Sequence, residues 1–245
     1  MPRFGVNRGQ WRQIGGEGEW ADTRALLGYE GRIFASHGNG KLFSIDVASG
    51  AWTQHGDSSG WNTKLMFALS GKILLLEHTG TLWGVDPDSG AYEQLSGDGE
   101  WINIDCGDWT ESAVYCHSRE GTLWEWSING GWRQLGDSTG WTSRLVFSAN
   151  GLLTIEQDDT VYRVDASSGG AEPIGKTTFR PTVGVGLDGN AFACFTDGGL
   201  WDLDIAQGGW SEIGTAKTWK SKALVTTGDD LVTLEETGTL FEIYL

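Results

Sequence analysis

The chain repeats about every 40 residues, and this repeat constrains its fold more than any other feature. Each of six segments begins with an aromatic residue or, once, with glutamate, and a second aromatic follows no more than nine positions later. The first positions are Trp11, Trp52, Tyr92, Trp132, Glu172 and Trp210, and the following aromatics are Trp20, Trp61, Trp101, Trp141, Phe179 and Trp219. A hairpin signature such as Gly80-Thr81-Leu82-Trp83 then recurs in tight or looser form. Repeats of this kind stack on one another and share a continuous core.

Each segment is predicted to hold four short β-strands. In the second segment they are expected at 63–69, 72–78, 81–86 and 91–95. Hairpin turns are expected where glycine follows a small polar residue, because Gly and Asn tolerate a positive φ. These pairs are Ser70-Gly71, Asn150-Gly151 and Asp188-Gly189. Turns of the form Asp-x-x-Ser-Gly, in which the Asp side chain accepts hydrogen bonds, are expected at Asp46–Gly50, Asp86–Gly90 and Asp165–Gly169.

Repeats of about 40 residues with four strands each are typical of β-propeller blades. The predicted fold is therefore all-β, a six-bladed β-propeller in which residues 1–245 form one domain. The last segment stops at Leu245 after three strands, and residues 11–15 precede the first complete hairpin as an unpaired fourth strand. Pairing this N-terminal strand with the three C-terminal strands closes the ring and removes an exposed sheet edge.

The charge balance excludes two classes of partner. Lys and Arg total 17 against 33 Asp and Glu, a formal net charge of −16. Nucleic acids and anionic membrane surfaces are bound by neutralising phosphates, so neither is an expected partner. No apolar run is long enough for a membrane-spanning helix, so membrane insertion is not expected either.

Cysteine usage and the N-terminus bear on the compartment. Cys106, Cys116 and Cys194 are too few and too irregularly spaced for a disulfide framework, and free thiols suit a reducing compartment. Residues 1–8 lack the apolar stretch of a secretory signal. The expected location is the cytoplasm, or outside the cell after release by a route without a signal peptide.

Two loops and a hairpin carry a family resemblance. Residues 56–62 and 136–142 share the pattern Gly-Asp-Ser-(Ser/Thr)-Gly-Trp-(Asn/Thr). Together with the Gly80-Thr81-Leu82-Trp83 hairpin, this pattern resembles the repeat of tachylectin-type and tectonin-type propeller lectins over nearly the whole chain. The resemblance implies a lectin with several equivalent shallow sites for sugars such as N-acetylhexosamines.

The second, fourth and sixth segments share a further pattern, as if the chain held three copies of a two-blade unit. Each has a Trp-x-(Ser/Thr)-(Lys/Arg) loop and a glutamate five residues before the hairpin Leu or Val. A two-residue turn at Ser70-Gly71 is expected to place Lys64 directly opposite Glu77. A sugar can then stack on the Trp while its hydroxyls bridge the charged pair. The predicted carbohydrate-binding residues are Trp61, Asn62, Lys64, Glu77, Trp141, Arg144, Glu156, Trp219, Lys222 and Glu235.

A structural interpretation of the same residues stays open. Opposed Lys and Glu side chains are ordinary cross-strand pairs, worth about 0.2–1 kcal/mol each. A recurring loop Trp can also wedge neighbouring blades together, and Trp20 and Trp101 occur in segments that lack the charged pair. Seven other tryptophans are expected to pack between blades: Trp11, Trp52, Trp132 and Trp210 at the start of segments, and Trp83, Trp124 and Trp201 in the hairpins.

Catalytic, metal and cofactor sites are not expected, and the protein is predicted not to be an enzyme. No Gly-x-Ser-x-Gly nucleophile motif is present. Glu77, Glu156 and Glu235 are expected to lie too far apart for one acid–base or calcium cluster. The histidines have no spacing typical of metal ligands; they are His37, His55, His78 and His117.

Three functions are considered. The first is a lectin whose repeated sites give avidity for glycans or glycoconjugates, with an oligomer compatible with it. The second is an acidic protein-interaction scaffold that docks a basic partner. The third is a hydrolase that uses the central tunnel, for which the sequence offers no recognisable catalytic group.

Overall fold

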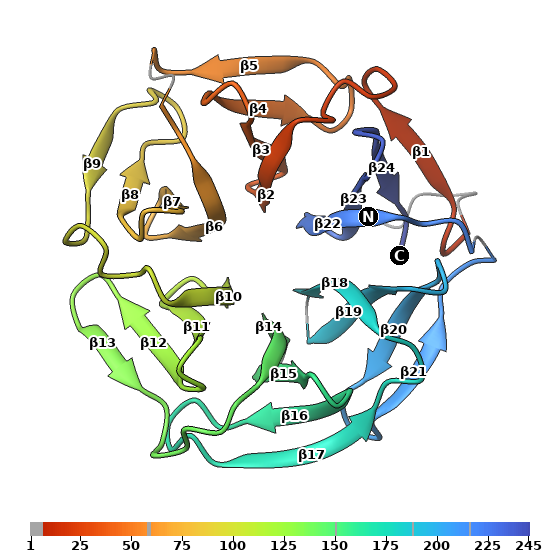
Figure 1. Ribbon diagram of the computed structural model, residues 1–245. Coiled ribbons are helices and arrows are strands. Elements are labelled where there is room, and N and C mark those ends of the chain that lie inside the picture. The colour runs from red at the N-terminus through yellow and green to blue at the C-terminus, as the bar shows by residue number, and fades with distance from the viewer. Residues whose placement is uncertain (1–6, 58–59, 150, 188, 216) are drawn as a thin grey trace.

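Six four-stranded antiparallel sheets are arranged around a ring (Figure 1). The computed structural model describes residues 7–57, 60–149, 151–187, 189–215 and 217–245. We number the sheets as blades 1 to 6 in chain order, and in each blade the first strand lies nearest the central axis and the fourth at the rim. The six-bladed, all-β propeller predicted from the repeat is confirmed.

The strands are short and follow one another around the ring. Blades 1 and 2 contain β2 (Thr23–Tyr29), β3 (Arg32–His37), β4 (Leu42–Asp46), β5 (Trp52–His55), β6 (Thr63–Leu69), β7 (Lys72–Glu77), β8 (Leu82–Val85) and β9 (Tyr92–Gln94). Blades 3 and 4 contain β10 (Ile104–Trp109), β11 (Val114–Ser118), β12 (Leu123–Ser127), β13 (Gly131–Gln134), β14 (Ser143–Ser148), β15 (Leu152–Glu156), β16 (Thr160–Val164) and β17 (Ala171–Lys176). Blades 5 and 6 contain β18 (Pro181–Leu187), β19 (Asn190–Phe195), β20 (Leu200–Asp204), β21 (Gly209–Glu212), β22 (Ser221–Thr227), β23 (Asp230–Glu235), β24 (Leu240–Ile243) and β1 (Trp11–Ile14).

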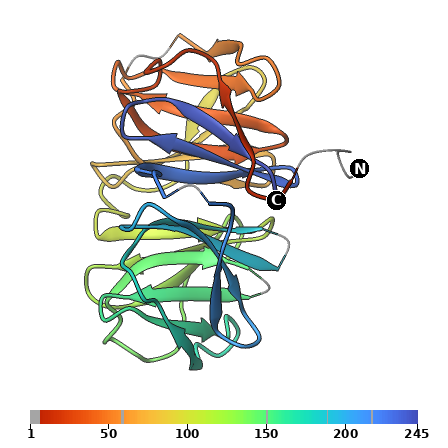
Figure 2. The same ribbon diagram turned by 90° about the vertical axis from the view of Figure 1, so that its right-hand side faces the viewer.

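The N-terminal strand closes the ring, as predicted. Strand β1 pairs antiparallel with β24, with Trp11 opposite Ile243 and Ile14 opposite Leu240. Blade 6 therefore has the order β1-β24-β23-β22, built from both ends of the chain. Figure 2 shows the closed ring from its edge, with β1 lying beside the C-terminal strands.

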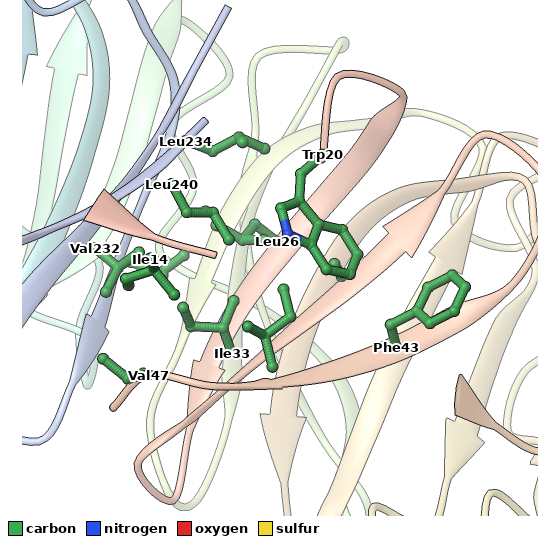
Figure 3. Close-up of a cluster of buried hydrophobic side chains, with 12 residues drawn as sticks. Ile14, Trp20, Leu26, Ile33, Phe43, Val47, Val232, Leu234 and Leu240 are labelled. Carbon is green, nitrogen blue, oxygen red and sulfur yellow. The ribbon is translucent and has the colours of Figure 1, made fainter. Parts of the chain in front are cut away.

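The hydrophobic core consists of clusters that span the boundaries between neighbouring blades. One cluster joins Val232 and Leu234 of blade 6 to Ile33 and Phe43 of blade 1, with the Trp20 ring between them (Figure 3). Each large apolar side chain that is fully buried contributes about 1.5–3 kcal/mol. No blade could bury this surface alone, so the ring is stable as a unit.

A backbone hydrogen bond joins the two repeated motifs across each of several blade boundaries. The Trp101 N–H donates to the Gly80 carbonyl of the preceding blade at 2.8 Å. Gly80 has a φ of 81°, and a Cβ at this position would lie 2.5 Å from the backbone nitrogen of Ile102. Only glycine fits, which explains why the hairpin signature begins with it. The same bond joins Trp20 to Gly238, Trp61 to Gly40, Trp141 to Gly121 and Trp219 to Gly198.

The Asp-x-x-Ser-Gly turns adopt the predicted structure. The Asp46 carboxylate accepts hydrogen bonds from the backbone N–H of Ser49 at 2.7 Å and from its hydroxyl at 2.6 Å. In the equivalent turn, hydrogen bonds from the Ser167 and Ser168 hydroxyls lower the pKa of Asp165 to about 2. These carboxylates therefore stabilise their own turns.

The hairpin turn at Ser70-Gly71 also has the predicted geometry, with φ values of 53° and 78°. Positive φ at both residues is the geometry of a type I′ turn. Several other residues of the sequence motifs lie outside the described part of the chain; they are Ser58, Ser59, Asn150, Asp188 and residues 1–6.

The three cysteines are free, and desolvation is the main cause that raises their thiol pKa values, to about 12 for Cys106 and Cys194. The absence of a disulfide framework matches the prediction. Among the residues that the structure describes, no helix is long and apolar enough to span a membrane.

Candidate functional site

The predicted pairing of Lys64 with Glu77 is wrong, because the first hairpin of blade 2 contains a β-bulge. Strand pairing runs in register from Leu69 down to Leu65, which lies opposite Leu76, but Glu77 lies opposite Thr63. Lys64 is the extra residue. Its Nζ donates to the Ile104 carbonyl of blade 3 and lies 3.4 Å from Asp105 Oδ1. An inserted residue re-aims its side chain, so the base turns away from the glutamate of its own blade.

A bulge also separates the base from the glutamate in the other two even blades. Ser143 lies opposite Glu156, and Arg144 binds Asp159 Oδ1 at 2.7 Å. Ser221 likewise lies opposite Glu235. The bulged Lys222 donates from Nζ to the Ala21 carbonyl of blade 1 at 2.6 Å. In none of the three described even-blade sites do the base and the glutamate form an ion pair.

The even-blade glutamates hold the loop that precedes their own blade. Glu77 Oε1 accepts a hydrogen bond from the Asn62 N–H at 2.8 Å. Glu235 accepts bonds from the Lys220 N–H at 2.6 Å and the Ser221 hydroxyl at 2.9 Å. Glu156 does the same for Thr142 and Ser143. Glu156 and Glu235 are buried, and their carboxylates accept hydrogen bonds from backbone and hydroxyl donors that are withdrawn from water.

The even-blade loop tryptophans offer little surface for stacking. The Trp61 side chain is only 6 % exposed, and Trp219 is similarly buried. Trp61 is covered by edge contacts to Trp83 and Tyr92, with ring centroids 5.9 and 5.3 Å apart. Trp141 is half-buried and packs edge-on against Tyr162. These contacts support the interpretation of the loop tryptophans as packing residues.

The exposed aromatic rings lie instead on the outer strands. Trp11 and Trp52 are 51 % exposed and Tyr92 is 55 % exposed. Of the first aromatics predicted to pack between blades, Trp132 and Trp210 contact core clusters that span two blades, but the prediction is wrong for Trp11 and Trp52. Each makes its ring contacts inside its own blade, as Trp52 does with Phe43 at 5.3 Å and Trp11 with Phe241 at 5.2 Å. The hairpin aromatics likewise contact rings of their own blades, as Trp124 does with Trp132.

In blades 1 and 3 a surface glutamate holds the indole of the outer strand. The Trp52 Nε1–H donates to Glu19 Oε1 at 2.8 Å, and the other oxygen of Glu19 accepts the Gly16 N–H at 2.9 Å. In blade 3 the Trp132 Nε1–H donates to Glu100 Oε1 at 2.9 Å, and the Gly97 N–H donates to the other oxygen of Glu100 at 2.8 Å. Both loops read Gly-x-Gly-Glu-Trp.

Blade 3 combines this glutamate with a cavity of about 270 Å³. Trp124 and Trp132 line it together with Glu100, Asn103 and Glu120. The Asn103 amide donates to Glu120 Oε1 at 2.9 Å. The sequence did not predict that these residues come together. The repeated Gly-x-Gly-Glu-Trp loop was the pattern that pointed to the glutamates. Two aromatic side chains beside carboxylate and amide groups are chemistry suited to a polar ligand with an apolar face.

The possible metal ligands of the chain are the side chains of His, Cys, Asp and Glu. No group of three or more His, Cys, Asp or Glu side chains is arranged to hold a metal ion in the described ranges. His55 Nε2 lies 2.7 Å from the Ser44 hydroxyl, and His117 Nε2 lies 3.1 Å from the Trp141 carbonyl. Both histidines are thus bound within the fold.

No family model matches the chain, and no curated protein matches it. Solved structures resemble it in fold. A protein of unknown function from Bacteroides thetaiotaomicron has a TM-score of 0.70 and 14 % identity, over 97 % of this chain and 76 % of the other. A chain of a mitotic checkpoint complex has a TM-score of 0.67 and 11 % identity, over 100 % and 97 %. A virginiamycin B lyase from Staphylococcus aureus has a TM-score of 0.61 and 10 % identity, over 96 % of this chain and 88 % of the other. Such identities establish the propeller fold alone.

Proposed function

We propose that the protein is a multivalent carbohydrate-binding protein whose sites lie on the outer strands, foremost in blade 3. The observation that carries this proposal is the blade 3 cavity, in which Trp124 and Trp132 lie beside Glu100, Asn103 and Glu120. A sugar has apolar C–H faces, which suit an indole ring, and hydroxyl groups, which suit carboxylate and amide acceptors. Because Glu100 already holds the Trp132 indole in place, little ordering is needed on binding.

Repetition around the ring supports several weaker sites. Blade 1 has the same pair of groups in Glu19 and Trp52, and exposed aromatic rings also occur at Trp11 and Tyr92. Shallow sites of this kind bind single sugars weakly, and simultaneous contact with a glycan-covered surface raises the overall affinity by about 10²–10⁴-fold. The resemblance of the repeat to tachylectin-type and tectonin-type lectins also supports this class of ligand.

A glycan array with labelled protein tests the proposal, with free N-acetylglucosamine and N-acetylgalactosamine as competitors. Trp132→Ala is expected to remove the blade 3 site and lower the number of sites measured by titration calorimetry. Glu172→Ala is the matched control, because Glu172 begins the equivalent outer strand of blade 4 without an aromatic ring. Thermal melting checks that both variants fold. Equal binding by wild type and a folded Trp132→Ala protein would contradict the site.

A blank array with folded protein would instead favour the acidic interaction scaffold. The net charge of −16 supports that function, and it predicts capture of a basic protein that weakens steeply with salt. The carbohydrate proposal includes no chemical step, so no turnover of chromogenic glycosides is expected. Measurable turnover would favour the hydrolase interpretation.

A further inference from the structure

The β-bulge of the first hairpin recurs in all six blades and inserts one residue at the same position of each innermost strand. In each blade the strand pairing slips by one residue at the second position of the innermost strand. The innermost strands surround the central axis (Figure 1). The six bulged residues are Arg24, Lys64, Asp105, Arg144, Thr182 and Lys222. Four of the six are basic, in a chain with a net charge of −16.

Three of these basic residues line one cavity of about 240 Å³, to which all six innermost strands contribute. Arg24, Lys64 and Lys222 come from the consecutive blades 1, 2 and 6. The cavity is otherwise lined mainly by small and apolar residues, and the one carboxyl among its lining residues is Asp108. We call the cavity with these three cations the tunnel mouth. Three of the residues that line the cavity are basic and one is acidic, so the lining itself has a charge opposite to that of the chain.

Backbone carbonyls fix the three cations in position. Arg24 Nη1 donates to the Trp61 carbonyl of blade 2 at 2.8 Å, and its Nη2 donates to the Gly38 carbonyl at 3.1 Å. Lys222 Nζ donates to the Ala21 carbonyl, and Lys64 Nζ to a carbonyl of blade 3. An ammonium group has three donors and a guanidinium has five, so each retains N–H groups for a ligand. Held in this way, the cations lose little freedom on binding.

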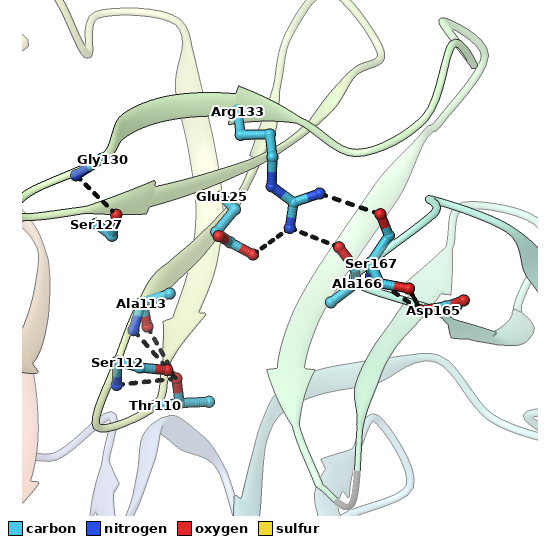
Figure 4. A network of polar contacts seen from close by, with 10 residues as sticks. All are labelled: Thr110, Ser112, Ala113, Glu125, Ser127, Gly130, Arg133, Asp165, Ala166 and Ser167. Carbon is cyan, nitrogen blue, oxygen red and sulfur yellow. Dashed lines mark hydrogen bonds and ion pairs between the residues drawn. The ribbon is translucent and has the colours of Figure 1, made fainter.

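Arginines near the rim make a similar bond to the neighbouring blade, but their charge is neutralised. Arg133 of blade 3 donates to the Ala166 and Ser167 carbonyls of blade 4 and pairs with Glu125 at 2.6 Å (Figure 4). Arg163 and Arg12 likewise pair with glutamates of their own blades. A structural bond between blades therefore occurs elsewhere with a carboxylate partner.

At the tunnel mouth, two of the three cations have no carboxylate partner of this kind. Within the described ranges, no carboxylate lies at ion-pair distance from Arg24 or Lys222. Lys64 lies 3.4 Å from Asp105, which Arg119 also binds at 2.8 Å. Burial lowers the pKa of Lys222, and Asp22 acts against this shift. A group that is partly withdrawn from water and has no counter-ion is stabilised by an anion that supplies one.

We propose that the tunnel mouth binds a small molecule that carries a phosphate group. A phosphate offers three terminal oxygens and up to two negative charges, which match three basic residues lining one cavity better than a single carboxylate does. The cavity also has room beyond the phosphate, so the group is held either as free phosphate or as part of a small phosphate ester such as a sugar phosphate. This site is separate from the blade 3 cavity and does not rest on the proposed carbohydrate function.

Titration calorimetry near neutral pH and at low salt tests the proposal with three probes: inorganic phosphate, glucose 6-phosphate and glucose. Binding of both phosphates but not glucose is expected, with tighter binding of the ester if the rest of the cavity is used. Lys222→Gln is expected to weaken phosphate binding by about tenfold or more. Arg133→Gln is the matched control, because it removes a bond between blades without touching the tunnel, and should leave phosphate affinity unchanged. Lys222→Arg keeps the charge and should retain binding.

Two results would overturn the site. One is the absence of phosphate binding by the wild-type protein; the other is an equal loss of affinity in Arg133→Gln and Lys222→Gln. If Lys222→Gln does not fold, the salt dependence of the wild-type protein decides. Raising sodium chloride from about 20 mM to about 200 mM must then weaken phosphate binding severalfold, because screening acts on charged groups that solvent reaches. Affinity independent of salt would refute a cationic site.

Discussion

The even blades use the carboxylate of a glutamate in the opposite way from blades 1 and 3. In blade 6 the Glu235 carboxylate is buried and accepts hydrogen bonds from its own loop, whose Trp219 is also buried. In blade 3 the Glu100 carboxylate is exposed and holds the indole of Trp132 on the outer strand. The same two residue types stabilise the fold in one set of blades and shape a surface in the other.

The difference shows that recurrence in a repeat protein has two physical origins. The loops that lead into blades 4 and 6 have backbone and hydroxyl donors that fold away from water, and a buried carboxylate satisfies several of them at once. The requirement for an acceptor therefore recurs wherever the loop recurs, without any ligand. A carboxylate that is exposed and bound to a half-exposed indole satisfies no such buried donor of the core, so the blade 3 arrangement is the better guide to binding.

The largest expected effect separates buried from exposed tryptophans. Trp61→Ala should destabilise the fold by about 3–5 kcal/mol, because it empties space at the boundary between blades 1 and 2. Trp52→Ala removes a ring that is 51 % exposed, and should cost roughly 1 kcal/mol or less of stability. Denaturant unfolding measures both free energies. Similar stability losses in the two variants would remove the structural distinction between the loop and rim tryptophans.

The glutamates give the next largest effect. Glu235→Ala should lower the free energy of unfolding by about 2–4 kcal/mol, since it leaves a buried N–H and a hydroxyl without their charged acceptor. Glu100→Ala at the surface should change stability by about 1 kcal/mol or less. The measurement is again denaturant unfolding, with glycan binding tested in parallel. Loss of glycan binding in a stable Glu235→Ala protein would return the binding site to the even blades.

The innermost strands extend the comparison to pH. Blade 3 has Asp108 where the even blades have Phe67, Phe147 and Val225, and burial raises the pKa of this carboxyl to about 6. The unfolded value is about 3.9, so the folded protein binds the proton more tightly between the two values. The contribution of Asp108 to stability is therefore present at about pH 4 and is lost as the pH rises through 6, by roughly 2–3 kcal/mol.

Asp108→Asn tests this sign, because an amide does not ionise in that range. The variant should be more stable than wild type above about pH 7, and the advantage should shrink by about 2–3 kcal/mol as the pH falls to about 4. Comparing the two proteins at each pH cancels the effect of other groups, such as the turn carboxylates. A difference that does not change with pH would mean that Asp108 stays ionised in the folded protein.

The fold could be predicted from local chemistry, whereas the site could not. The aromatic spacing recurs in five of the six segments, and the pairing of β1 with β24 followed from the strands expected at the two ends of the repeat. The expected contact of Lys64 with Glu77 failed because counting from the turn assumes an uninterrupted strand, and one bulged residue reverses which side chains meet. Trp52 and Trp61 could not be told apart by type, since only packing decides which ring is covered.

The smallest expected effect concerns the two surface glutamates together. In a Glu19→Gln, Glu100→Gln variant each indole N–H can still bond to an amide oxygen, so the rings should keep their positions and the fold its stability. What changes is the charge that strengthens hydrogen bonds to sugar hydroxyls, a loss of about 1 kcal/mol at each site. Affinity for a single sugar should fall about fivefold, but agglutination of glycan-coated particles should fall more steeply, because avidity multiplies the losses of separate sites. Equal losses in the two assays would mean that only one of the two blades binds, and would confine the surface role of glutamate to blade 1 or blade 3.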